Sequence, residues 1–217
     1  LVAGFINTLA GGGSMLTLPL LIFIGLPANI ANGTNRVAIL LQNLIGVKTF
    51  RDKKVIDFSR DYRLVIPAVL GSIIGALVAV EIDAGLLKNV IAVLMILMLM
   101  LVVLKPEAWI RDHAGEISAR PDFFQYLIFF FIGIYGGFIQ MGVGFFLLAG
   151  LVLGSGYDLV KANAVKVFII LIYTVFSIGI FMFYDQINWF AGLILAAGNM
   201  AGAWLGVHFT IRGGAKY

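Results

Sequence analysis

Seven long runs of apolar residues follow one another along the chain. A bilayer core is about 30 Å thick, and about 20 apolar residues in a helix cross it. We place spans or half-spans at 1–25, 28–50, 64–80, 86–104, 123–153, 161–184 and 189–211. With 61% hydrophobic and 12% charged residues, the chain has too few polar side chains to cover a soluble globule. The sequence predicts an all-α polytopic membrane protein with seven or eight spans and excludes a soluble enzyme.

Glycines interrupt the first and the fifth run, at residues 11–14 and 142–144, so that Gly11 corresponds to Gly142. The same offset in the numbering pairs Asn32 with Asn163. A later contraction of four residues aligns Gly71 and Gly75 with Gly198 and Gly202. We therefore expect two homologous membrane repeats with glycine-broken helices. The expected division is repeat 1 at 1–104, a polar linker loop at 105–122 and repeat 2 at 123–217.

Equivalent loops of the two expected repeats differ in charge. The loop Arg51–Arg63 holds five Lys and Arg residues, and its counterpart Asp185–Asn188 holds none. Conversely, the loop Glu81–Gly85 holds none, and its counterpart after the last span holds Arg212 and Lys216. Because positive loops face the cytoplasm, this bias predicts an inverted-topology repeat. A parallel repeat, in which the interrupted runs cross the membrane, is the alternative.

The expected repeats also differ at their ends. The span at 86–104 has no counterpart after Tyr217, and the lead-in at 123–134 has only a stub before Leu1. From this difference we expect the native chain to extend past both ends, by part of a helix at the front and about one helix at the back.

The interrupted runs predict a binding site. A glycine break in a span frees backbone N–H and C=O groups, which is tolerated only where they face protein or a watery cavity. A half-helix that begins near Ser14 would direct its positive dipole end at an anion. From these two segments we predict as site residues Gly12, Gly13, Ser14, Gln140, Gly142 and Gly144. The alternative for the glycines is close helix packing, which we favour for Gly71, Gly75, Gly198, Gly202 and Gly206.

Four cations lie within or beside the apolar runs, Arg36, Lys48, Lys161 and Lys166. We interpret Lys48 and Lys161 as interfacial anchors, whereas Arg36 and Lys166 each have amides nearby in the sequence. All eleven acidic residues lie in loops or at span ends, whereas Arg36 and Lys166 do not. A cation inside a membrane costs several kcal/mol unless it meets an anion or water. Guanidinium and ammonium groups bind sulfonate, sulfite or carboxylate. We add as predicted site residues Asn32, Thr34, Asn35, Arg36, Asn163 and Lys166. The alternative is that both cations snorkel to the membrane surface.

The segment Gly11–Leu21 (GGGSMLTLPLL), followed by Asn32–Asn35 (NGTN), resembles the sulfite exporter TauE/SafE family. The resemblance implies a secondary transporter in a bacterial plasma membrane. Its cargo would be a small sulfur-containing anion, such as sulfite, thiosulfate or an organosulfonate like sulfoacetate, bound centrally between the repeats. The second half departs from the motif, because Val143, Phe145 and Gly150 stand where the first half has Gly12, Ser14 and Pro19.

Other functions are open or disfavoured. A passive anion channel and a carrier for small carboxylates are alternatives to the sulfur-anion transporter. The chain has no cysteine, no Walker, GxSxG or HExxH motif, and only the histidines His113 and His208, so we expect no catalytic residues, metal or cofactor. The net charge of +4 is modest, so we expect membrane lipid and no nucleic acid as a partner, with a homo-oligomer left open.

Overall fold

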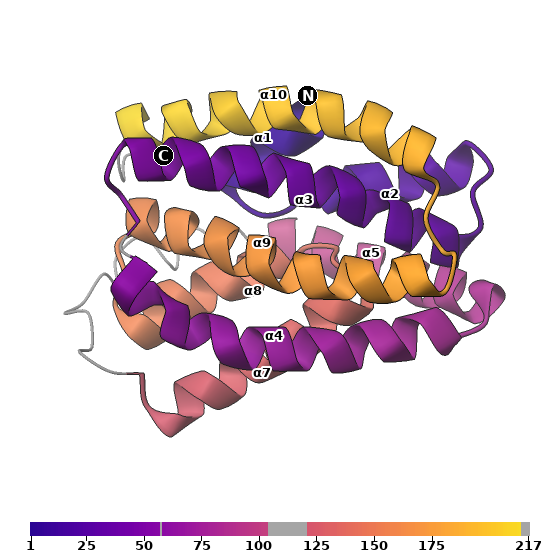
Figure 1. The fold of residues 1–217 in the computed structure, drawn as a ribbon, viewed down its shortest axis with the longest axis horizontal. Helices are drawn as coiled ribbons and strands as arrows, with labels where there is room; N and C mark the ends of the chain where they lie inside the picture. Colours follow the sequence, from indigo (N-terminus) through magenta and orange to yellow (C-terminus); the bar gives the residue numbers. More distant parts are fainter. Residues whose placement is uncertain (57, 104–120, 214–217) are drawn as a thin grey trace.

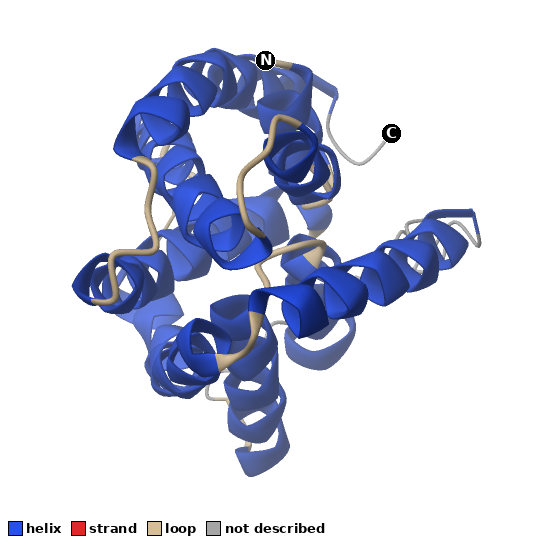
Figure 2. Cartoon of the chain, turned by 90° about the vertical axis from the view of Figure 1, so that its right-hand side faces the viewer, coloured by secondary structure: helices blue, strands red, loops and turns tan. Residues whose placement is uncertain are grey.

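The computed structural model describes residues 1–56, 58–103 and 121–213, and this part of the chain consists of helices and loops without strands (Figures 1 and 2). The helices are α1 (Val2–Leu9), α2 (Ser14–Phe23), α3 (Ala28–Asp52), α4 (Phe58–Glu81), α5 (Ala84–Val103), α7 (Phe123–Phe138), α8 (Val143–Ala149), the π-helical turn η1 (Gly150–Gly154), α9 (Leu159–Phe183) and α10 (Trp189–Gly213). The all-α prediction is confirmed, and the first and fifth runs are broken as expected. Residues 105–120 of the predicted linker lie outside the described residues.

The lengths of the helices fit a polytopic membrane protein. Within the described ranges, three helices are long and apolar enough to cross a bilayer: Tyr62–Glu81, Leu159–Phe183 and Trp189–Arg212. Shorter apolar helices are Ser14–Phe23, Ala84–Met100, Phe123–Phe138 and Val143–Gly154. Helix α3 is as long as α9, but buried polar residues along it make it less apolar. Its polar face is therefore turned into the protein.

Helices α3 and α9 pack against each other in the middle of the bundle. Helix α4 packs on α7 and α9, and α10 packs on α1 and α3. In Figure 1, α3 and α10 run from right to left, whereas α9 and α4 run from left to right. Helix α3 is thus antiparallel to α9, and α4 is antiparallel to α10.

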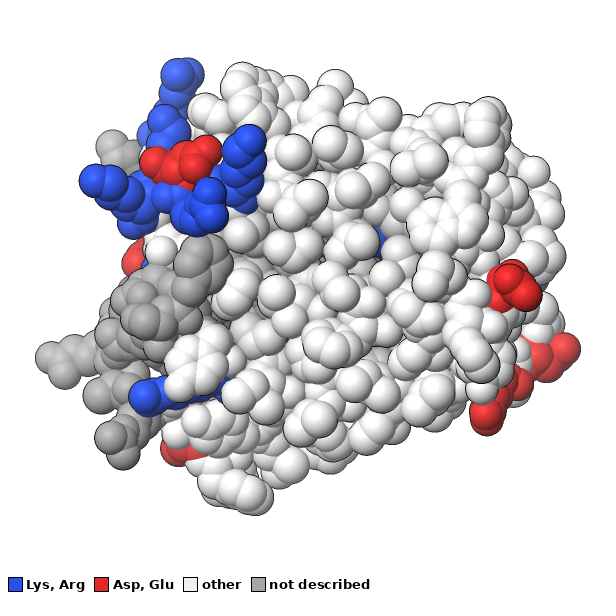
Figure 3. Space-filling view, in the orientation of Figure 1, with Lys and Arg blue, Asp and Glu red and all other residues white. Residues whose placement is uncertain are grey.

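The basic side chains gather at one end of the bundle. Figure 3 shows Lys and Arg clustered at the left, where α3 and α10 end and α4 begins, together with a few acidic side chains, whereas acidic side chains predominate at the right. At the right-hand end the Gln186 side chain donates to the Val80 carbonyl over 2.8 Å. The loop between α9 and α10 therefore meets the C-terminal end of α4.

Helix bounds and turns recur in the two halves of the chain at the offset that pairs Gly11 with Gly142. Helix α9 begins and ends where this offset places the counterparts of the ends of α3, and α10 begins at the counterpart of the start of α4. The described residues with positive φ form pairs at the same offset: Gly11 and Gly142, Gly25 and Gly156, Lys54 and Asp185. The expected contraction of four residues is wrong, because the unbroken offset places Gly71 and Gly75 opposite Gly202 and Gly206.

Glycines let the backbones of α4 and α7, and of α10 and α1, approach closely. A Cβ atom on Gly71 would overlap the Phe130 backbone, and one on Gly202 would overlap the Leu1 backbone. Likewise Gly133 lies on Ala68, and Gly4 lies on Asn199. These glycines therefore have the packing role that small residues have in membrane helices.

The contacts of α4 with α7 and of α10 with α1 show that α1 and α7 correspond at a different offset. This offset is two residues shorter than the one that pairs Gly11 with Gly142, and it pairs Gly4 with Gly133. The difference falls in the breaks: one residue, Ala10, separates α1 from Gly11, whereas Ile139, Gln140 and Met141 separate α7 from Gly142. The second break is therefore longer by two residues and includes a polar side chain that the first break lacks.

Candidate functional site

The two helix breaks touch each other through glycine. The Cα of Gly144 occupies the position that a Cβ of Gly11 would need, and the Cα of Gly11 does the same for Gly144. Gly11 has φ of 86° and Gly142 has φ of 71°, a left-handed region that favours glycine. The chain therefore brings its two interrupted helices together at their backbones.

Arg36 reaches from α3 to the C-terminal end of α7. Its guanidinium donates to the carbonyls of Gly136 (3.2 Å), Gly137 (2.5 Å) and Phe138 (3.4 Å) and to the Ser177 hydroxyl (3.1 Å). Asn32, one turn earlier on α3, donates to the same Phe138 carbonyl over 2.8 Å.

The last carbonyls of a helix have no intrahelical donor and carry the negative end of its dipole. Arg36 thus neutralises the end of the first half of a broken helix. Its guanidinium carbon also lies 4.4 Å from the centroid of the Phe181 ring, an attractive cation–π contact.

Lys166 makes the corresponding contact from α9 to the C-terminal end of α1. Its ammonium donates to the carbonyls of Asn7 (3.3 Å) and Thr8 (2.9 Å) and to the Asn163 side-chain oxygen (2.7 Å). At the offset that pairs Gly4 with Gly133, Asn7 and Thr8 are the counterparts of the two glycines whose carbonyls Arg36 binds. Each cation therefore binds the end of the first half-helix of the break that lies in the other half of the sequence. We call each of these two sets of hydrogen bonds a clasp.

The alternative interpretation of these cations is wrong. Arg36 and Lys166 are both 0% exposed, so neither snorkels toward a membrane surface. The acids whose side chains the structure describes are exposed and lie at helix ends and in loops: Asp52, Glu81, Asp83, Asp122, Asp158 and Asp185. Among the described side chains, neither cation forms an ion pair with a carboxylate. The interior thus holds two cations whose partners are neutral groups and helix-dipole ends.

The extra residues of the second break bring Gln140 to α9. Its side-chain amide donates to the hydroxyls of Thr174 (2.7 Å) and Tyr173 (3.4 Å). The Ser177 hydroxyl, which accepts from Arg36, donates to the Thr174 carbonyl over 3.3 Å. A polar network thus runs from Arg36 on α3 through Ser177 and Thr174 on α9 to Gln140 in the second break.

The α9 members of this network, Tyr173, Thr174 and Ser177, were not predicted from the sequence. A signal was present, because they share a helical face with Asn163 and Lys166 at spacings of three to four residues or their multiples. Buried Gln42 and Asn43 continue the polar face of α3 in the same way.

The first turn of α2 carries two buried polar side chains, Ser14 and Thr17. Thr17 donates its hydroxyl to the Asn35 side-chain oxygen over 2.6 Å. Ser14, the first residue of α2, is 2% exposed, and its hydroxyl oxygen has no hydrogen-bond partner in the structure. An unpaired buried hydroxyl at the positive end of a helix is suited to an incoming acceptor.

The other predicted residues have structural contacts. The Thr34 hydroxyl accepts from the Asn188 backbone over 2.9 Å, which ties α3 to the start of α10. Gly13 is the N-cap of α2 and packs on Ala3 and Asn7, and Gly142 is the N-cap of α8. The ring of Phe145 packs on Gly12. Thr34 therefore connects two helices, whereas the three glycines lie at the helix breaks.

Several polar atoms near the breaks are buried without a hydrogen-bond partner. They are the Ser14 hydroxyl, the Nε of Arg36, and the side-chain oxygens of Asn32 and Gln140. A buried polar group without a partner costs about 1–3 kcal/mol, so most native proteins avoid it. No group of three or more His, Cys, Asp or Glu residues that could hold a metal occurs within the described ranges.

A bundle of apolar helices whose broken members surround buried cations and polar groups is typical of an integral membrane transporter. The chain belongs to the sulfite exporter TauE/SafE family, which matches it over residues 1–217.

Three relatives are named as probable membrane transporter proteins. ORF9 of a Sinorhizobium species is 28% identical over 99% of this chain and 82% of its own length. A Haemophilus influenzae protein is 29% identical over 98% of this chain and 83% of its own length. YfcA of Escherichia coli K12 is 27% identical over the whole of this chain and 80% of its own length. No solved structure matches the chain significantly.

Proposed function

We propose that the protein is a secondary transporter that moves small sulfur-containing anions, such as sulfite, thiosulfate or sulfoacetate, across a bacterial plasma membrane. The observation that carries this proposal is the pair of fully buried cations, Arg36 and Lys166, in an interior where no acid with a described side chain is buried. Ionisable groups inside a membrane mark substrate pathways, and two positive charges favour an anionic cargo. The family name, sulfite exporter, adds the sulfur chemistry.

The anion would bind next to the first break, at the start of α2. There the Ser14 hydroxyl is free to donate, and the helix dipole favours negative charge. The unpaired Nε of Arg36 would supply a charged donor. The unpaired atoms of Asn32 and Gln140 are acceptor oxygens, so these amides would have to rotate for an N–H group to meet the anion. A sulfur oxyanion presents several acceptor oxygens, which matches a site with several donors.

The proposal includes an inverted repeat. The antiparallel directions of α3 and α9 and of α4 and α10 support it (Figure 1), as do the paired clasps of Arg36 and Lys166. Helix pairs related in this way reach the binding site from opposite sides of the membrane, which is how many transporters alternate access. The basic end of the bundle in Figure 3 would face the cytoplasm.

In a transport cycle, the two clasps would determine which helices move together. Arg36 joins α3 to the end of α7, and Lys166 joins α9 to the end of α1. Each long central helix would therefore carry a half-helix with it when the repeats move. An anion that competes for the Arg36 or Lys166 donors would weaken a clasp, which couples binding to movement.

Counterflow into liposomes tests the function. The purified protein is reconstituted into vesicles loaded with unlabelled thiosulfate, and labelled thiosulfate is added outside. We expect saturable uptake that sulfite and sulfoacetate inhibit and acetate does not. A current that does not saturate would show a channel, and equal inhibition by carboxylates would show a carboxylate carrier; either result overturns the proposal.

A further inference from the structure

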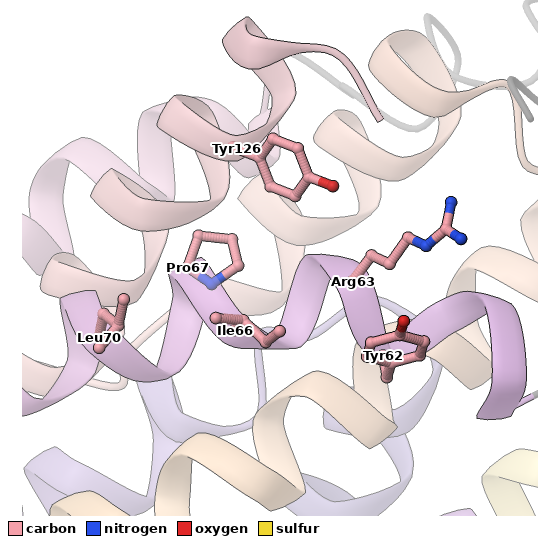
Figure 4. Close-up of a pocket in the computed structure, with 6 residues that line it drawn as sticks. All are labelled: Tyr62, Arg63, Ile66, Pro67, Leu70 and Tyr126. Atoms are coloured by element: carbon pink, nitrogen blue, oxygen red, sulfur yellow. The ribbon is translucent and has the colours of Figure 1, made fainter. Parts of the chain in front are cut away.

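A groove lies between α4 and α7 near the basic end of the bundle, away from the helix breaks. Its lining residues are Tyr62, Arg63, Ile66, Pro67, Leu70 and Tyr126, and its volume is about 450 Å³. Figure 4 shows the Arg63 guanidinium and the hydroxyls of Tyr62 and Tyr126 toward one end, with Leu70 at the other. The volume lies within the range of small-molecule sites.

The groove opens where the tight packing of α4 on α7 stops. Gly133 lies against the backbone of Ala68 and holds the two helices together. Two turns earlier on α7 the corresponding position is Tyr126, whose ring lines the groove. The groove therefore lies beyond the glycine contact, toward the end of the bundle where Figure 3 shows Lys and Arg.

The polar end of the groove fits a phosphodiester. A guanidinium binds phosphate oxygens through paired N–H groups, and tyrosine hydroxyls add neutral donors. Among the side chains that the structure describes, no carboxylate forms an ion pair with Arg63. Tyr62 is 47% exposed and Tyr126 is 36% exposed, so both side chains are accessible from outside the bundle.

The other end of the groove fits an acyl chain. Ile66 and Leu70 are each 55% exposed, and Ile74 and Leu77 continue the same exposed side of α4 toward the acidic end. The four residues follow one another at three- and four-residue spacings and form an apolar strip along the helix. In a membrane such a strip lies against lipid tails, and tyrosines lie at the level of the headgroups.

We infer that this groove binds one anionic phospholipid, with its phosphate on Arg63, Tyr62 and Tyr126 and its acyl chain along Ile66, Pro67 and Leu70. Pockets with basic residues on the cytoplasmic side of membrane proteins bind anionic headgroups. The inference depends on the position of the protein in a membrane and not on which anion it transports. The lipid would also cover the seam between α4 and α7, which joins the two halves of the sequence.

Native mass spectrometry of the purified full chain in detergent tests the inference. The probes are phosphatidylglycerol and phosphatidylcholine with identical acyl chains. We expect the chain to bind phosphatidylglycerol at least tenfold more tightly than phosphatidylcholine. Arg63→Gln should weaken phosphatidylglycerol binding about tenfold, the scale of a charge-assisted hydrogen bond. The matched control is Arg212→Gln, which removes an exposed charge at the same end of the bundle and should change binding less than twofold.

A second variant keeps the test independent of the charge change. Tyr62→Phe combined with Tyr126→Phe preserves both rings and removes both hydroxyls, and should weaken phosphatidylglycerol binding about fivefold. Inorganic phosphate at millimolar concentration should not displace the lipid. Equal losses for Arg63→Gln and Arg212→Gln, no loss for either groove variant, or displacement by phosphate alone would each overturn the inference.

Discussion

The Lys166 ammonium donates a hydrogen bond of 2.9 Å to the carbonyl of Thr8, 158 residues earlier in the sequence. Thr8 belongs to the last turn of α1, where carbonyls have no donor from their own helix. The bond therefore satisfies a group that hydrocarbon could not. It also joins the beginning of the chain to its second long central helix.

Lys166→Met should destabilise the protein, because a side chain of similar length then leaves the Asn7 and Thr8 carbonyls without a donor. We expect a loss of about 1–3 kcal/mol in unfolding free energy, the cost of buried unsatisfied polar groups. The measurement is thermal unfolding in detergent. Lys48→Met is the control, since Lys48 is exposed on α3 and should have little effect. Equal unfolding temperatures for the two variants would contradict the clasp.

Arg36→Ala and Lys166→Ala should each weaken anion binding by about 1–3 kcal/mol, because both remove positive charge from the interior. The measurement is the stabilisation of the native state by thiosulfate, since a ligand that binds the native state raises its unfolding temperature. Unchanged affinity in both variants would remove these residues from the site.

Gly11→Ala should be strongly destabilising. Its φ of 86° costs an L-residue about 1–2 kcal/mol, and the new Cβ would overlap the Gly144 backbone. Gly179→Ala is the control, because nothing lies within 4 Å of a Cβ at that position of α9. We expect the control to unfold at the same or a slightly higher temperature. Tolerance of Gly11→Ala would show that the breaks do not touch.

Ser14→Ala should lower the affinity for the anion about tenfold or more, as expected for loss of a hydrogen bond to a charged ligand. Ser155→Ala is a matched control, because its hydroxyl is also buried and without a partner but does not begin α2. Thermal-shift titration with thiosulfate compares the two variants. If both lose affinity equally, Ser14 has no specific part in the site.

Single cysteines at Lys54 and Asp185 should react from opposite sides of the membrane. The 217-residue sequence has no cysteine, so each single-cysteine variant of it carries one reactive group. The two positions are counterparts at the offset that pairs Gly11 with Gly142, and they have φ of 57° and 53°, so they occupy equivalent turns at opposite ends of the bundle. Labelling of intact cells with a membrane-impermeant maleimide, before and after permeabilisation, gives the side. Reaction of both from the same side would exclude the inverted topology.

The hydropathy of the sequence predicted most of the helices because apolar length is read directly from composition. The interruptions in the first and fifth runs were also predicted, since glycine clusters mark places where a membrane helix cannot continue. The correspondence at α1 and α7 was not predicted. Two additional residues around Gln140 shift the offset, and only the packing of Gly133 on Ala68 and of Gly4 on Asn199 reveals it.

The candidate site was predicted in composition but not in contacts. Arg36 and Lys166 were expected to face an anion, whereas in the structure they donate to carbonyls of other helices. A single sequence does not say which helix end a cation meets, because that depends on contacts between residues far apart in the chain. Thr34 shows the same limit, since its partner at Asn188 lies in a distant loop.

Main chain touches main chain where Gly11 meets Gly144, so no side chain separates the two broken helices at that point. We expect such a contact to act as a pivot between the two repeats. A tilt of one broken helix about this contact would part the two on one side and press them together on the other. Two openings on opposite faces of the membrane would then be mutually exclusive by leverage alone, without a separate gate for each.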